Sequence, residues 1–272
     1  RAGIMEALKK RHHYGTTGTR MHLEVHANLA SGGQLFDRDP HAFDDATSTP
    51  VQRVMMGDIV QTEDRKLQVD INCIAQTPIE RIEVRNGKDV VETLRPYSKA
   101  DLGHRIRVLW SGAEYRGRGR DTTWRGRVRF GGTRILKLSK INAWNKERLL
   151  EVRGDDTVIF EAVTTGNYSG FDVWLDEHET GQLEICTNLG DLSIALDEIG
   201  LEDTIMDAGG LKREIHVLRL PDANPHRELH TSVEVPLKAE GDNPLWVSVY
   251  TEDGFQAWSS PIFAYNKDKW PA

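Results

Sequence analysis

Apolar and polar residues alternate with a period of two along most of this 272-residue chain. Segments 21–25 and 79–84 have this pattern, which is typical of β-strands with one buried face. Asn86-Gly87 follows the second segment and leads into the apolar residues of 90–94, so this stretch predicts a hairpin with a type I′ turn. The other segments that predict strands are 67–71, 105–110, 126–130, 134–138, 157–163, 170–175, 182–187, 192–199, 213–220, 231–237 and 245–250.

One segment near the start has a helical period instead. Residues 3–11 place apolar side chains at positions 4, 5 and 8 and end in basic residues, which suits a helix C-terminus that His12 and His13 extend. Gly15 is the expected C-cap. Segment 192–199 also fits a short helix, but its neighbours favour a strand. Many short strands with few helices predict an all-β protein, with two antiparallel β-sandwich-like domains preceded by a short helix.

Three stretches interrupt the alternation. Residues 29–53 are polar and rich in Asp, and we expect a long loop there. Residues 111–124 are dense in Gly and Arg. Residues 221–230 contain Pro, Asp and Asn, which favour turns, and predict a linker.

Charge and cysteine content narrow the classes of function. Lys and Arg number 35 against 42 Asp and Glu, and this net charge of −7 disfavours a nucleic-acid partner. No apolar stretch of about 18 residues occurs, so we expect no membrane span. Cys73 and Cys186 lie in alternating segments and are either buried reduced thiols or one long-range disulfide. The chain begins with Arg, and we interpret it as a piece of a longer protein.

Histidines and acids occur in two places with spacings that metal sites use. His22 and His26 are four residues apart, but in a strand that spacing is about 13 Å, too far for one small ion. Segment 37–45 holds four Asp and one His; its Asp-x-Asp pattern suits calcium, but the glycine and distal glutamate of a calcium loop are missing. We interpret both as solvated polar surfaces and Asp176-Glu177-His178-Glu179 as a hairpin turn. We therefore expect no catalytic residue and no metal ligand in this chain.

Seven arginines gather in residues 116–134 against a single acid, Asp121. Arg alternates with Gly in 116–120, which lets guanidinium groups and glycine amides converge on an anion. Arg116, Arg118 and Arg120 are therefore the candidate residues for binding an anion or a partner chain. The alternative is that the strand arginines, Arg125, Arg127 and Arg129, line a solvent face and pair with acids elsewhere.

Several longer motifs resemble a known family. Segments 7–11 and 14–20 (ALKKR and YGTTGTR) resemble the end of a PHP (polymerase and histidinol phosphatase) domain. IERIEVRNG (79–87), WSGAEYRGRGR (110–120) and WVSVYTEDGFQAWSSPI (246–262) strengthen the match, as do 209–211 with 219–221. Nearly the whole chain is similar to the C-terminal half of a domain-of-unknown-function family related to PHP metal-dependent hydrolases.

The resemblance implies a domain layout and a place for the metal. It implies a stub of the PHP-like domain at 1–20, a discontinuous first β-sandwich at 21–123 plus 241–266, and an inserted second β domain at 124–240. Segments 105–110 and 245–250 would then share one sandwich. A divalent metal ion (zinc, manganese or iron) would be bound upstream, because the final Asp-x-His motif of a PHP domain normally precedes the helix that begins this chain. The sequence has no His-x-His, and its two Asp-x-His spacings, at 39–41 and 176–178, lie after that helix. No cofactor is expected in this chain.

The sequence therefore favours an accessory β-sandwich region of a metal-dependent hydrolase or phosphoesterase, with the upstream PHP-like domain as its partner. The alternative is a non-catalytic binding module for a carbohydrate, a peptide or a partner protein that uses an exposed aromatic face. An enzyme complete within the chain would instead require a compact cluster of histidines and acids. The tryptophans available for an aromatic face are Trp110, Trp124, Trp144, Trp174, Trp246, Trp258 and Trp270.

Overall fold

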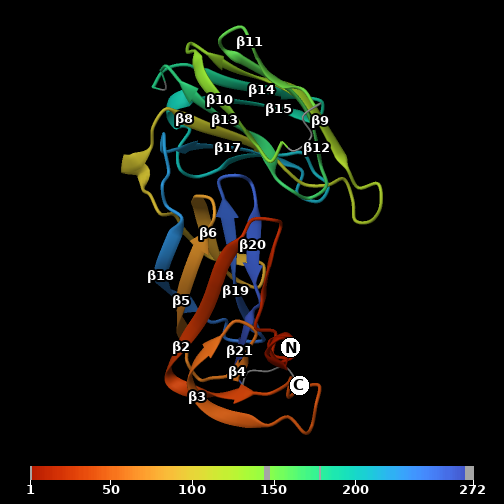
Figure 1. Cartoon of the computed structure of the whole chain (residues 1–272), viewed down its shortest axis with the longest axis vertical. Coiled ribbons are helices and arrows are strands. Elements are labelled where there is room, and N and C mark those ends of the chain that lie inside the picture. The colour runs from red at the N-terminus through yellow and green to blue at the C-terminus, as the bar shows by residue number, and fades with distance from the viewer. Residues whose placement is uncertain (1, 144–147, 178, 267–272) are drawn as a thin grey trace. The chain divides into compact units, whose positions relative to one another are not determined.

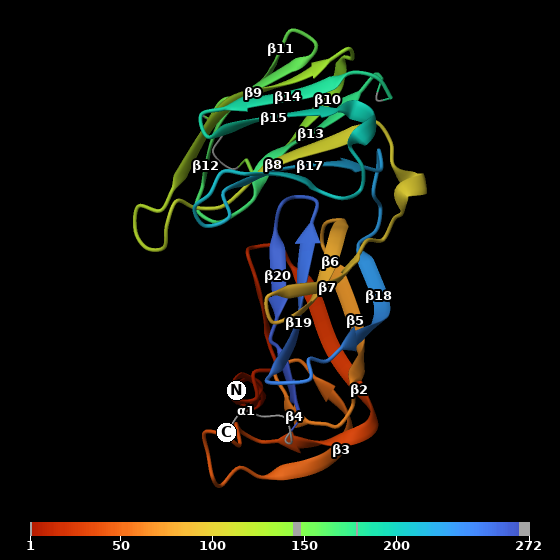
Figure 2. The ribbon, with the colours of Figure 1, turned by 180° about the vertical axis from the view of Figure 1, so that it is seen from behind.

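The computed structural model describes residues 2–143, 148–177 and 179–266 and is built almost entirely of β-strands (Figures 1 and 2). The all-β prediction is thus confirmed. The chain forms two compact units: unit 1 comprises Arg1–Pro96 with His226–Ala272, and unit 2 comprises Tyr97–Pro225. Unit 2 is therefore inserted into unit 1 along the sequence.

Unit 1 is one eleven-stranded sheet that curls around its own core. From one edge the strands run β1-β20-β19-β21-β4-β2-β5-β18, with β3 beside β2, and β6 joining β19 to β7. Apolar residues of β2 and β5 join those of β6 and β19 in a single core, so the two halves of the sheet face each other. The one parallel pair among the described strands is β4 with β21. The elements are α1 (Ala2–Lys9), β1 (Tyr14–Thr16), β2 (Met21–Phe36), β3 (Ser48–Met55), β4 (Ile59–Gln61), β5 (Lys66–Ala75), β6 (Ile79–Asn86), β7 (Asp89–Leu94), β18 (Glu228–Pro236), β19 (Asn243–Thr251), β20 (Gln256–Ser259) and β21 (Ile262–Tyr265).

Unit 2 is a sandwich of two five-stranded antiparallel sheets, β10-β13-β8-β17-β16 and β11-β12-β9-β14-β15. Inward residues of both sheets, among them Val108, Val128 and Phe160, form one core. The elements are η1 (Lys99–Asp101), β8 (Arg105–Trp110), β9 (Thr122–Gly131), β10 (Ile135–Ile141), β11 (Leu150–Arg153), β12 (Thr157–Thr164), β13 (Ser169–Leu175), β14 (Gln182–Thr187), β15 (Gly190–Ala195), η2 (Leu196–Glu198), β16 (Thr204–Asp207) and β17 (Glu214–Leu220).

The expectation that 105–110 and 245–250 share a sandwich is wrong. Strand β8 lies in the middle of a sheet of unit 2, where it is hydrogen-bonded to β13 on one side and β17 on the other. Strand β19 lies in unit 1 between β6 and β20. Residues 97–123 thus belong to unit 2 and 226–240 to unit 1, because the latter contain β18, which pairs along its length with β5.

The start of the chain contains the expected helix, but the helix ends differently. Arg11, not Gly15, has the left-handed conformation with a φ of 60°, and Gly15 lies in β1. The His12 amide donates to the Ala7 carbonyl over 2.9 Å and the Arg11 amide to the Leu8 carbonyl over 3.2 Å, a Schellman end. His12 does more than complement the helix dipole, because its Nε2 lies 2.7 Å from Asp58 Oδ1 and ties the helix to the β3–β4 turn.

The expected long loop at 29–53 is shorter in the structure. Strand β2 continues to Phe36 and β3 begins at Ser48, which leaves 37–47 as the connection. The pairing of β2 with β3 shifts register between Asn28 and Gly33, where Gly32 has a φ of 78°. Beyond this bulge the two strands pair again. Segment 192–199 is divided between the strand β15 and the 3₁₀ turn η2.

Both cysteines are free. Cys73 is buried in unit 1, and burial raises the pKa of its thiol to about 12. Cys186 is half-buried in β14 of unit 2. The structure thus agrees with reduced thiols rather than with a disulfide.

Candidate functional site

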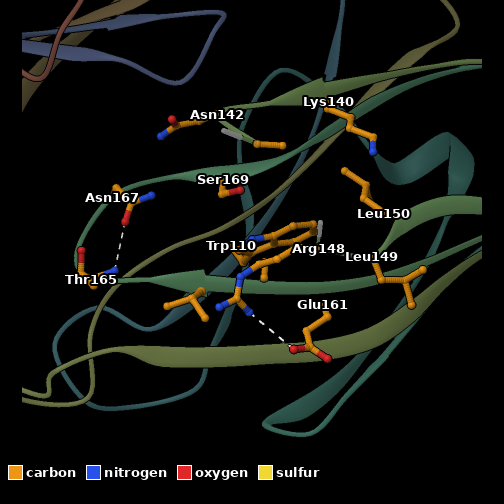
Figure 3. A pocket seen from close by; sticks show the side chains of 13 residues that line it. Trp110, Lys140, Asn142, Arg148, Leu149, Leu150, Glu161, Thr165, Asn167 and Ser169 are labelled. Atoms are coloured by element: carbon orange, nitrogen blue, oxygen red, sulfur yellow. Dashed lines mark hydrogen bonds and ion pairs between the residues drawn. The ribbon is translucent and has the colours of Figure 1, made fainter. Parts of the chain in front are cut away.

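A cavity of about 480 Å³ with a mostly apolar lining lies at one edge of the sandwich of unit 2. Strands β10 and β11 are the edge strands of their two sheets on this side. Their ends supply lining residues, together with the end of β8 and the β12–β13 connection (Figure 3). The lining residues are Trp110, Lys140, Asn142, Ala143, Arg148, Leu149, Leu150, Glu161, Ala162, Val163, Thr165, Asn167 and Ser169.

Trp110 is the largest side chain of this lining. Its ring stacks on Phe160 with a centroid distance of 4.2 Å and an angle of 4° between planes, and Phe171 meets it edge-on at 6.0 Å. Its buried Nε1 has no hydrogen-bond partner among the described residues. A buried donor without an acceptor costs about 1–3 kcal/mol, so an acceptor that reaches this N–H would be favoured.

One side of the cavity carries charge. Arg148 Nη1 lies 3.5 Å from Glu161 Oε1, and Arg125 Nε donates to Glu161 Oε2 over 3.1 Å. Figure 3 shows Arg148 reaching over Trp110 toward Glu161, with Lys140 and Leu150 beyond. Lys140 is exposed at the end of β10. The carboxylate is therefore already paired twice, and Lys140 adds a positive charge.

The other side is held by amide and hydroxyl groups. Asn142, in the left-handed region with a φ of 47°, donates from Nδ2 to the Tyr168 carbonyl over 2.7 Å. Asn167 Oδ1 accepts from the Thr165 amide over 3.0 Å, and the Ser169 hydroxyl donates to the Ile141 carbonyl over 3.4 Å. These bonds fix the β12–β13 connection against the end of β10, so this wall is formed before any ligand arrives.

The lining combines polar groups with an apolar surface. The thirteen lining residues include no histidine and no cysteine, and the one acid among them, Glu161, lies between two arginines. No group of three or more His, Cys, Asp or Glu side chains suited to a metal ion occurs within the described residues. The cavity offers donors, one paired carboxylate and an apolar surface, which together can orient a small polar molecule.

The three candidate arginines lie together in the β8–β9 connection. Arg116, Arg118 and Arg120 are exposed, and none forms an ion pair with a residue that the structure describes. The strand arginines largely follow the alternative: Arg125 pairs with Glu161, and Arg129 with Asp156 and Glu184. Arg127, also exposed on β9, forms no ion pair with a described residue. The strand arginines are therefore neutralised in part, and the three loop arginines form no described ion pair.

The histidine and aspartate spacings that resemble metal sites form no such site within the described residues. His22 and His26 lie on the same outward face of β2, as the strand interpretation predicted. The 37–47 connection is closed by its own contacts, since Asp37 Oδ1 accepts from the Thr47 amide over 2.8 Å and Asp39 Oδ1 from the His41 amide over 2.9 Å. His178, in the 176–179 turn, lies outside the described residues.

An exposed aromatic face is not present among the described tryptophans. Trp110 and Trp124 are buried, and Trp174, Trp246 and Trp258 are only partly exposed. Trp144 and Trp270 lie outside the described residues. A binding role would therefore use the cavity beside Trp110, which sequence patterns did not indicate.

Comparisons with models of known families, with curated proteins and with solved structures give no match for this chain. None of the helices in the described ranges has the length and apolar character needed to cross a membrane.

Proposed function

We propose that unit 2 is a non-catalytic binding module whose cavity holds a carbohydrate unit. The observation that carries this proposal is the preformed cavity of about 480 Å³ lined by Trp110, a residue whose buried Nε1 has no described hydrogen-bond partner. Sugar hydroxyls both accept and donate, so they suit the Trp110 N–H together with the Arg148–Glu161 pair. The C–H face of a sugar ring suits the apolar surface that Leu149, Leu150 and Val163 provide.

Calorimetric titration with neutral oligosaccharides of glucose, galactose, xylose and N-acetylglucosamine tests this proposal. Leu149→Trp places a large ring at the cavity rim, where Leu149 is 40% exposed, and we expect it to abolish binding. Leu136→Trp is the matched control, because Leu136 is 64% exposed on β10 and does not line the cavity. Equal binding by the two variants, or no binding of any sugar by the wild type, would refute the cavity as the binding site.

A second function rests on a different observation, the uncovered apolar face of α1. Ile4, Met5 and Leu8 are 68%, 55% and 53% exposed, and the helix has no buried residue. Apolar clusters of this kind usually mark an interaction surface. This supports the proposal that the chain is an accessory region of a larger metal-dependent hydrolase, in which α1 contacts an upstream PHP-like domain.

The test is to produce the longer natural chain with its upstream segment. We expect amide hydrogens of α1 to exchange more slowly there than in residues 1–272, and phosphoester hydrolysis with divalent metal ions only in the longer chain. Unchanged exchange of α1, or hydrolysis by residues 1–272 alone, would contradict this role.

A further inference from the structure

The β8–β9 connection joins strands of different sheets and forms a loop, the arginine hairpin (residues 113–121), that projects from unit 2 (Figures 1 and 2). The Glu114 amide donates to the Arg120 carbonyl over 3.0 Å and closes the loop. Gly117 and Gly119 have φ values of 117° and 71°, which side-chain-bearing residues rarely adopt. The alternation of Arg with Gly therefore follows from the turn itself, and it leaves three guanidinium groups exposed within five residues.

The arginines of this hairpin form no ion pair with a described residue, although Glu114 and Asp121 flank them in the sequence. Three exposed arginines elsewhere in unit 2 have partners, Arg129 with Asp156, Arg134 with Asp176 and Arg153 with Glu151. Arg127, exposed on β9, forms no ion pair with a described residue. A chain with a net charge of −7 has acids to spare, yet no described acid pairs with Arg116, Arg118 or Arg120. The hairpin thus keeps its charge available to an external anion.

The base of the hairpin is fixed to the wall of the cavity. Trp110 ends β8, and two residues later the Gly112 carbonyl accepts from the Gly166 amide over 3.0 Å and from the Thr164 hydroxyl over 2.7 Å. Thr164 and Gly166 flank Thr165, which lines the cavity. A Cβ on Gly112 would lie 2.0 Å from the Lys212 carbonyl oxygen, so the chain passes here without room for a side chain.

A second contact fixes the direction in which the hairpin leaves the sandwich. Ala113 and Leu211 exchange backbone hydrogen bonds of 3.2 and 2.8 Å in an isolated antiparallel bridge. The base of the hairpin therefore adjoins the wall of the cavity through direct hydrogen bonds. Tyr115, 49% exposed beside Arg116, adds an aromatic side chain to the hairpin.

We propose that the cavity and the arginine hairpin together bind an acidic polysaccharide, with one sugar unit in the cavity and the carboxylates of neighbouring units on Arg116, Arg118 and Arg120. This inference rests on the proposed carbohydrate site. Guanidinium groups bind carboxylates through paired hydrogen bonds, and Lys140 supplies a further cation at the cavity. A polyuronate repeats its charge along the chain, which suits arginines repeated at every second residue. The net negative charge of the protein favours a saccharide of modest charge density over a nucleic acid.

The test uses charged oligosaccharides with uncharged counterparts of the same sugar sequence. The probes are oligomers of galacturonate, mannuronate and hyaluronan, each compared with its carboxyl-reduced form by calorimetry at about 0.1 M salt. We expect the wild-type chain to bind at least one charged oligomer about tenfold more tightly than its reduced form. Exposed ion pairs are each worth a few-fold in affinity, and three of them give this factor.

Variants separate the hairpin from general charge effects. R116Q/R118Q/R120Q should lower the affinity for the charged oligomer to that of the reduced form and leave the reduced form unaffected. R129Q/R134Q/R153Q removes the same charge from ion-paired positions and should leave both affinities unchanged. Equal losses in the two triple variants would overturn the inference, as would binding of an oligothymidylate as tight as that of the charged sugar.

The outcomes also separate this inference from the cavity proposal. Binding of charged and reduced oligomers with equal affinity overturns the acidic preference and leaves the carbohydrate cavity standing. Binding of a charged oligomer that survives Leu149→Trp overturns the cavity and, with it, the joint site. Absence of binding to every probe overturns both.

Discussion

Asp172 holds the most buried charge cluster of unit 2, and its replacement by Asn should destabilise that unit strongly. The Arg107 side chain donates from Nε to Asp172 Oδ1 over 2.8 Å and from Nη2 to Oδ2 over 3.0 Å. Arg105 Nε donates to Oδ2 over 3.1 Å. Arg107 and Asp172 are 0% and 2% exposed, so solvent does not screen this cluster.

The size of the effect follows from this burial. Removing one partner of a buried ion pair costs about 3–5 kcal/mol, and Asn keeps one acceptor oxygen, so we expect about 3 kcal/mol. For residues 97–225, an unfolding entropy of about 0.27 kcal/mol/K then lowers the melting temperature of unit 2 by about 11 °C.

Scanning calorimetry of the whole chain measures this shift. Asp176→Asn is the control, because its exposed pair with Arg134 is worth at most about 1 kcal/mol. Exposure is therefore the only intended difference between the two changes. A shift for Asp172→Asn no larger than for Asp176→Asn would show that buried charge does not govern the stability of unit 2.

Three further predictions concern single side chains. Trp110→Phe keeps a ring against Phe160 but removes the unpartnered N–H, so calorimetry should show a sugar affinity about two- to tenfold weaker, and an unchanged affinity would exclude the N–H as a ligand contact. Burial raises the pKa of Cys73 to about 12, so iodoacetamide at pH 8.5 should label this thiol only after unfolding. The free energy of unfolding should also fall above about pH 9, where only the unfolded thiol ionises. Detection by mass spectrometry of labelled Cys73 in the native protein would refute the labelling prediction. Burial, aided by the charge of Arg53, lowers the pKa of His26 below its usual 6.5. As the pH falls through 6.5, His26 is therefore protonated in the unfolded chain before it is protonated in the folded chain, and the free energy of unfolding should decrease. An NMR titration midpoint of His26 above 6.5 in the folded protein would contradict this prediction.

The fold class could be predicted because strand period and turn chemistry are local. Asn86-Gly87 forms the expected hairpin between β6 and β7, with Gly87 at a φ of 63°. Strands β4, β20 and β21 contain only three or four residues each, too few to show an alternation. The second half of β2 contains Ser31-Gly32-Gly33 and was interpreted as a loop, because the sequence does not show that the bulge at Gly32 is followed by renewed pairing with β3.

The assignment of strands to units could not be predicted in the same way. An apolar alternation shows that a segment is a strand, but it does not show which strands pair with it or to which unit it belongs. In β8 the polar positions Arg105 and Arg107 predict a solvent face, yet all six residues are buried, because Asp172 of β13 neutralises both arginines. Asp172 is 65 positions away from Arg107, so the sequence of β8 alone does not show that its arginines are neutralised.

The arginine hairpin and the cavity differ in how far the sequence could predict them. The arginine hairpin could be identified from sequence, since its charge and its glycines lie within five consecutive residues. The cavity could not, because its lining comes from five strands and the turns between them. Trp110 and Trp124 both lie in the core of unit 2, but Trp124 Nε1 donates to the Thr164 hydroxyl over 3.0 Å whereas Trp110 Nε1 has no described partner. Whether a buried indole N–H has a partner thus depends on a hydroxyl 40 residues away, and only the folded chain shows which of the two tryptophans has one.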